Sequence, residues 1–156
     1  MASFKAVLPD AVMRDFKFIY DNTEEIFGEM TQAGAGVAMG SIKAGVPLPE
    51  MAGFVKLTRT YRTPSDGGIN TKVYMSGYLP FKGNRSSFDR RGRSGNGTVY
   101  KTNKGIPVDF LGILYEYGRS NRPFPKKPFL RSAFGGGAIE EAMLEAQRRA
   151  SGGLLE

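Results

Sequence analysis

The chain has 156 residues and contains no Cys, no His and no Trp. Ser-His-Asp and Cys-His catalytic sites, Cys/His zinc sites and thiol redox chemistry are therefore excluded. The length suits one domain, and such a domain can bury a core without disulfides or metal ions. We expect a single domain over residues 1–156, with 151–156 as a tail.

The net charge of +7 is concentrated in two segments of the chain. The first is a predicted flexible loop or arm over residues 82–105, whose basic residues are Lys82, Arg85, Arg90, Arg91, Arg93, Lys101 and Lys104. The second carries Arg119, Arg122, Lys126, Lys127 and Arg131, with no acidic residue among them. Such asymmetry indicates contacts with a polyanion or an acidic surface. The alternative for both segments is a solvated basic stretch that keeps the protein soluble.

The N-terminus and the hydropathy pattern predict a cytosolic protein. Residues 1–10 lack a cationic stretch followed by an apolar core, so we expect no signal peptide. No run approaches the ~18 apolar residues of a membrane span, so we expect no membrane partner. The absence of Cys fits a reducing compartment.

Two helices are predicted in the first third of the chain. Asp10 is placed to cap a helix that runs to Tyr20, with Val12, Phe16 and Ile19 on one face. A capping-box pattern at residues 22–25 then begins a second helix, or a continuation, that runs to about residue 44.

The second predicted helix contains Gly34, Gly36 and Gly40, each of which costs about 1 kcal/mol relative to Ala. A helix that keeps three glycines is expected to pack its small face closely against a neighbour, which is either a sheet or another subunit. The alternative is a break near Gly34. The Gly34–Gly40 run also differs from a dinucleotide-binding fingerprint, because the third glycine comes one residue late and no strand precedes it.

Strand-like alternation dominates the middle of the chain. Residues 53–62 and 71–79 alternate with period two and flank a turn-rich stretch at 63–68, which predicts an antiparallel hairpin. The most apolar stretch, 106–117, is interpreted as a strand end or a helical turn in the core. A final helix is predicted over 138–150, with Ile139, Ala142, Met143 and Ala146 on one face. The fold class is therefore α+β, a small antiparallel sheet with a long N-terminal helix packed on it and a C-terminal helix.

No catalytic, metal or cofactor site is predicted. The carboxylates lie mostly on predicted helix surfaces, and nothing in their spacing brings two of them into one cleft. Asp109 and Glu116 flank the most apolar stretch and are expected to be partly buried. Glu116 is expected to accept backbone hydrogen bonds or to pair with Arg119 or Arg131.

Six aromatic residues are interleaved with the second basic segment between Phe110 and Phe134. Aromatic and basic side chains together bind single-stranded nucleic acids, and they are also enriched in protein interfaces. The three prolines of the segment, Pro123, Pro125 and Pro128, favour a pre-shaped protein interface. The candidate interface residues are Glu116, Tyr117, Arg119, Phe124, Phe129 and Arg131. For Phe129 the alternative is a place in the core of the subunit itself.

Two steps in this segment resemble the signature of a protein family. Glu116-Tyr117-Gly118-Arg119-Ser120 is followed, after a proline-rich spacer, by Pro128-Phe129-Leu130-Arg131-Ser132-Ala133. This pattern is similar to that of the neck or tail-completion proteins, a tail-component family of tailed bacteriophages of the siphophage type. The order of predicted elements over residues 22–150 is similar too. Arg119 replaces the usual Thr, Ser132 replaces the usual Pro, and the 82–105 segment is longer and more basic.

The resemblance implies a non-enzymatic structural protein of the virion. Members of the family are small α+β subunits that form a ring, expected to be a hexamer, at the head–tail junction. The implied partners are sister copies, portal, adaptor or head-closure proteins, and tail-terminator or tail-tube proteins, with genomic DNA passing through the lumen. The implied location is the virion, assembled in the bacterial cytoplasm.

Two alternatives to a neck subunit stay open. The same basic segments suit a nucleic-acid-binding accessory protein, which would use Arg85, Arg90, Arg91, Arg93, Lys101 and Lys104 on DNA. The chain as a tail-terminator subunit would also be a structural protein of the virion, but it would contact different neighbouring proteins.

Overall fold

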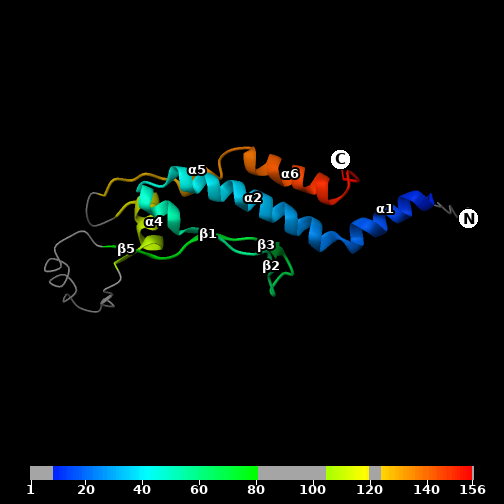
Figure 1. Ribbon diagram of the computed structural model, residues 1–156, viewed down its shortest axis with the longest axis horizontal. Coiled ribbons are helices and arrows are strands. Elements are labelled where there is room, and N and C mark those ends of the chain that lie inside the picture. Colours follow the sequence, from blue (N-terminus) through cyan, green and yellow to red (C-terminus); the bar gives the residue numbers. More distant parts are fainter. Residues whose placement is uncertain (1–8, 81–104, 120–123, 156) are drawn as a thin grey trace, which may run out of the picture. The chain divides into compact units, whose positions relative to one another are not determined.

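The computed structural model describes residues 9–80, 105–119 and 124–155. Helices and short paired strands make up the described chain, with the strands following one another between α2 and α4, so the fold is α+β, as the sequence predicts (Figure 1). The chain divides into two compact units. Unit 1 comprises the described residues of 9–41, 57–73 and 134–155, and unit 2 comprises those of 42–56, 74–80, 105–119 and 124–133. Residues 82–104 of the predicted basic loop lie outside the described residues.

Unit 1 is built on two helices that lie side by side (Figure 1). Its elements are α1 (Asp10–Asp21), α2 (Thr23–Gly45) as far as Ser41, β2 (Tyr61–Arg62), β3 (Ile69–Asn70) and α6 (Ala138–Ala150). Ile26 and Ala38 of α2 and Ala146 of α6 are buried. β2 and β3 form the predicted hairpin, an antiparallel pair with Tyr61 opposite Asn70.

The glycines of α2 show that close packing is confined to one position. A Cβ atom on Gly34 would lie 2.7 Å from Cγ of Met143 and 3.3 Å from Ile139, whereas nothing lies within 4 Å of such an atom on Gly36 or Gly40. α2 stays helical through all three. The predicted close approach is therefore confirmed for Gly34, and the neighbour is α6 rather than a sheet or another subunit.

The α1 helix has a different environment from the other helices of unit 1. Its residues are those predicted, but none of them is buried. Pro9 occupies the N-cap position and Asp10 is the first helical residue, so the predicted cap by Asp10 is wrong. Asp10 instead places a negative charge in the first turn, where the helix dipole favours it. The side chain of Asn22 donates to the carbonyl oxygen of Phe18 at the end of α1 rather than opening α2.

Unit 2 holds the largest fully buried side chains of the described residues, those of Met51, Glu116 and Val108. Its elements are α2 from Ile42, η1 (Pro49–Phe54), β1 (Val55–Leu57), β4 (Val73–Met75), β5 (Tyr78–Leu79), β6 (Ile106–Pro107), α4 (Val108–Tyr117) and α5 (Leu130–Ala133), where β1 and β4 run across the unit boundary. β5 and β6 pair antiparallel, with Leu79 opposite Ile106. Met51 and Val108 are completely buried, and Phe129 packs close to Gly45 and Gly112.

The strands are shorter than the sequence predicts. The predicted strand over 53–62 is divided into β1 and β2, and η1 occupies the residues before it. The hydroxyl of Thr58 accepts the N–H of Lys72, which replaces a ladder bond between backbones at this point. The predicted strand over 71–79 is divided in the same way into β4 and β5. The apolar stretch at 106–117 is a short strand followed directly by helix α4.

Candidate interaction surface

Glu116 joins the two halves of the segment that the sequence singled out. Its side chain is buried in unit 2, with 1% of the residue exposed. The carboxylate accepts the N–H groups of Phe129 and Leu130, both at 2.9 Å, and that of Arg131 at 3.3 Å. These are the donors that the start of α5 leaves without helical partners. The expectation that Glu116 accepts backbone hydrogen bonds is therefore confirmed.

The surroundings of Glu116 favour its charged form. Burial raises the pKa of this carboxyl, because it penalises the charged form. The three backbone N–H groups and the Arg131 guanidinium act in the opposite direction, and the net pKa lies below its ordinary value of 4.5. Glu116 is thus held as a carboxylate whose hydrogen-bonding capacity is occupied by the chain itself.

Gly118 explains why glycine follows Glu116 and Tyr117 in the signature. It ends α4 with φ 82° and ψ −165°, a combination that is essentially restricted to glycine. Its N–H donates to Leu114, and the N–H of Lys127 donates to the carbonyl oxygen of Tyr115. The described part of the proline-rich segment is thereby tied to α4 at both Lys127 and Phe129.

Arg131 connects the buried carboxylate to the surface. Its Nε lies 3.5 Å from Oε1 of Glu116, although 69% of its side chain is exposed. The guanidinium also stands over the ring of Tyr117, 5.0 Å from the ring centroid. Arg131 therefore presents its guanidinium in a defined position at the surface. A planar guanidinium is well suited to such a site, because it can bind a carboxylate and stack on an aromatic ring at the same time. Of the two partners predicted for Glu116, it is Arg131 that makes the ion pair.

The six predicted interface residues differ in whether they can meet a partner. Tyr117, Arg119 and Arg131 are exposed, whereas Glu116 and Phe129 are 1% and 2% exposed. The prediction of Phe129 as a contact residue is corrected, because its ring fills the core of unit 2. Glu116 likewise positions the segment without lying on its surface. Phe124 is half-buried and packs edge-on against Tyr115, with ring centroids 4.9 Å apart.

Other predicted residues fall outside the site or outside the described chain. The basic residues Arg85, Arg90, Arg91, Arg93, Lys101 and Lys104 lie outside the described residues. Asp109, expected to be partly buried, is exposed. The step at 128–133 leads into the short helix α5, which ends before α6 begins at Ala138.

An exposed apolar stripe on α4 was missed by the sequence reasoning. Phe110, Ile113 and Tyr117 are 53%, 55% and 60% exposed. Their spacing of three and four residues places them on one face of the helix, opposite the face that buries Val108 and Gly112. The spacing was visible in the sequence, but the stretch was interpreted as a strand end or a helical turn in the core, and of the three residues only Tyr117 was predicted to lie at an interface.

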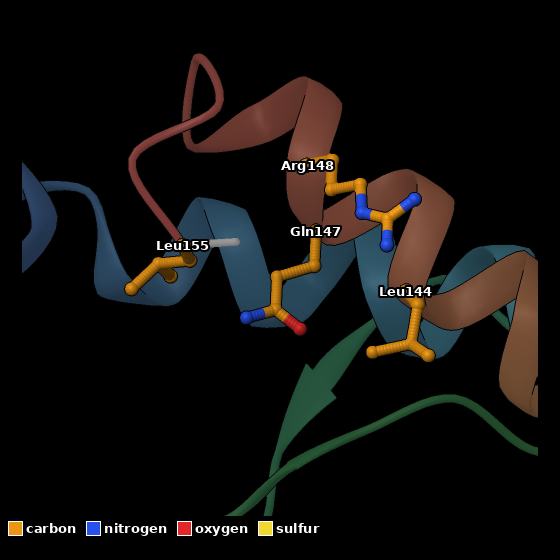
Figure 2. A pocket seen from close by; sticks show the side chains of 4 residues that line it. All are labelled: Leu144, Gln147, Arg148 and Leu155. Atoms are coloured by element: carbon orange, nitrogen blue, oxygen red, sulfur yellow. The ribbon is translucent and has the colours of Figure 1, made fainter.

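The described hollows are small and have mixed linings. One, of about 340 Å³, is lined by Leu144, Gln147 and Arg148 of α6 and by Leu155 of the C-terminal tail (Figure 2). Another, of about 560 Å³, lies between α2, Thr60 and α6 in unit 1. Within the described ranges, no three acidic side chains converge as metal ligands would. No helix in the described part of the chain is long and apolar enough to cross a membrane.

Comparisons with known proteins add no further information on this site. No family model matches the chain, and neither a curated protein nor a solved structure is significantly similar to it. Function is therefore inferred from the geometry of the segment and from the short signature within it.

Proposed function

We propose that the chain is a structural subunit of a tailed-bacteriophage virion that forms a homo-oligomeric ring at the head–tail junction and joins the connector to the tail. The observation that supports this proposal is the set of hydrogen bonds from Phe129, Leu130 and Arg131 to the Glu116 carboxylate, which we call the Glu116 clamp. The two steps of the family-like signature, which are separated along the chain, meet at one carboxylate. Because residues of the first step hydrogen-bond to residues of the second, the two steps are expected to occur together in one sequence.

The clamp prepares the segment for binding. Because the backbone at residues 127–131 is fixed by hydrogen bonds to α4, little conformational freedom is left to lose when it docks. The exposed side chains that the clamp holds in place, Tyr117 and Arg131, belong to the types that dominate binding energy in protein interfaces. In the proposed ring these side chains contact a sister copy or an adjoining ring of portal, head-closure or tail-terminator proteins.

The function has a direct genetic test. In a phage that carries this gene, a null mutation is expected to give DNA-filled heads and complete tails that do not join, and supplied protein is expected to restore joining in a mixed lysate. Electron microscopy and plaque counts provide the readout. Joined particles in the null mutant would contradict the proposal. A variant with Glu116→Gln should restore joining less well than one with Asp109→Asn, because only the former disturbs the clamp.

The alternative of a nucleic-acid-binding accessory protein is decided by a binding assay. That function predicts tight, salt-dependent and sequence-independent DNA binding by the monomer, since phosphate contacts release counterions. The ring function predicts that the purified chain assembles, and that any DNA affinity is weak at physiological salt. Tight binding by a monomer would favour the alternative.

A further inference from the structure

Helix α1 has an apolar face that is largely exposed among the described residues. Val12, Phe16 and Ile19 follow one another at helical spacing, and Met13 and Tyr20 extend the same face. The exposed fractions are 53% for Met13, 60% for Phe16 and 81% for Tyr20. The opposite face carries Asp10, Arg14, Lys17 and Asp21. No other element of unit 1 that the structure describes runs alongside α1 (Figure 1).

The face is large enough for a substantial part of an interface. A buried aromatic side chain accounts for about 150–250 Å², so Phe16 and Tyr20 together present roughly 300 Å². Met13 adds to this area. Apolar patches of a few hundred Å² on a monomer are often functional. A standard interface takes ~800 Å² from each partner.

Charge separates the two units in a complementary way. On α1 itself, Asp10, Asp15 and Asp21 outnumber Arg14 and Lys17. Exposed Glu25 follows in the first turn of α2, whereas Glu24 is already paired with Arg62. The α4 stripe of Phe110, Ile113 and Tyr117 has the reverse surroundings, because Arg119, Lys126, Lys127 and Arg131 gather at its C-terminal end. Asp109, at the N-terminal end of the stripe, is the acidic group on that side of α4.

We propose that the apolar face of α1 docks on the α4 stripe of a second copy of this chain. Each surface is an exposed apolar strip on a helix, and the charges around the two strips have opposite signs. A contact between two different surfaces of one molecule is heterologous, and repetition of it gives either a closed ring or an open filament. The inference deepens the proposed function and rests on it for the closure into a ring.

A lipid surface is the other occupant that an amphipathic helix can have. Helices that lie on membranes carry Lys and Arg on the polar face, whereas the polar side of α1 carries more acidic than basic groups. The observations therefore favour a protein partner with a basic rim. Co-sedimentation of the parent chain with vesicles of phosphatidylglycerol, lost on Phe16→Ala, would overturn the proposal.

Engineered cysteines test the contact without interference, because the chain has none of its own. Phe16→Cys and Ile113→Cys are made in separate chains, which are then mixed and oxidised. A disulfide between positions 16 and 113 can form only between copies. Lys17→Cys is the matched control, since Lys17 points about 100° around the helix from Phe16, on the polar side of α1. We expect the 16–113 link to exceed the 17–113 link at least tenfold on a non-reducing gel, with mass spectrometry to identify the peptides.

Results that contradict the α1–α4 contact can be distinguished from results that contradict the proposed function. Links between positions 16 and 16 as abundant as 16–113, or 16–113 links no stronger than the Lys17 control, would overturn the proposal. If the parent assembles into rings and Phe16→Ala assembles equally well, the α1 contact is wrong and the ring stands. If the 16–113 link forms but the null phage still joins heads to tails, the contact stands and the function is wrong. If Phe16 is a hot-spot residue of this contact, Phe16→Ala should raise the dissociation constant of assembly by about 30-fold or more.

Discussion

Helices α1 and α6 are similar in length and amphipathicity but differ in what covers them. α6 places Ala146 in the core of unit 1 and packs Met143 against Gly34 of α2. α1 buries none of its residues and leaves Phe16 and Tyr20 largely exposed. The same pattern of apolar residues thus seats one helix inside the subunit and leaves the other with a face suited to another molecule.

The difference extends to unit 2. The segment that leads to α5 is fastened internally by Glu116, while the α4 stripe beside it stays exposed. Substitutions at internally fastened positions should therefore lower the free energy of unfolding. Substitutions on the uncovered faces should change assembly alone.

The largest effect is expected at Glu116. Glu116→Ala leaves three N–H groups of the segment without their acceptor, and hydrogen bonds to charged groups contribute about 1.5–3 kcal/mol each. We expect a loss of about 3 kcal/mol or more in denaturant unfolding. Asp109→Ala on the same helix is the control and should cost less than about 1 kcal/mol. Equal melting of the two variants would mean that the clamp does not hold the segment.

The next effect distinguishes the glycines of α2. Gly34→Ala should destabilise by about 1–3 kcal/mol, because the added methyl group meets Met143 and Ile139. Gly36→Ala and Gly40→Ala have open space and should gain up to about 1 kcal/mol from helix propensity. Thermal melting of the three variants measures the difference. A gain at Gly34 equal to that at Gly36 would show that α6 does not pack on this position.

Acid should weaken the clamp in a defined direction. The folded-state pKa of Glu116 lies below its ordinary value of 4.5, so its contribution to stability is fully present above pH 4.5 and is lost as pH falls through the folded value. Glu116→Gln lacks this titration. The difference in melting temperature between parent and Glu116→Gln should therefore be constant above about pH 5.5 and shrink below pH 4.5. A difference that grows on acidification would contradict the assignment.

The smallest effect on folding is expected at α1. Phe16→Ala removes a ring that is 60% exposed, and surface substitutions usually change stability by no more than about 0.5 kcal/mol. A buried Phe→Ala would cost about 3–5 kcal/mol instead, as expected for Phe129. Melting curves of Phe16→Ala and Phe129→Ala make the comparison. If Phe16→Ala melts as early as Phe129→Ala, then α1 is packed within the subunit.

Local patterns in the sequence predicted much of this fold. The bounds of α1, α2 and α6 follow from helical spacing, and alternation located the strands near Val55, Val73 and Leu79. The position of Glu116 between an apolar stretch and a basic one predicted its hydrogen bonds. What escaped prediction depends on tertiary packing. The gap between β1 and β2 contains a side-chain hydrogen bond of Thr58, and the burial of Phe129 follows from its packing near Gly45 and Gly112.

The central claim is that copies of this chain associate into a closed ring, and light scattering coupled to size-exclusion chromatography tests it most directly. Across a wide range of protein concentration, the account predicts one oligomer of fixed mass in equilibrium with monomer, with no larger species. Repetition of a heterologous contact that closes gives this result. A monomer at every concentration, or an open series of masses that grows with concentration, would contradict the account.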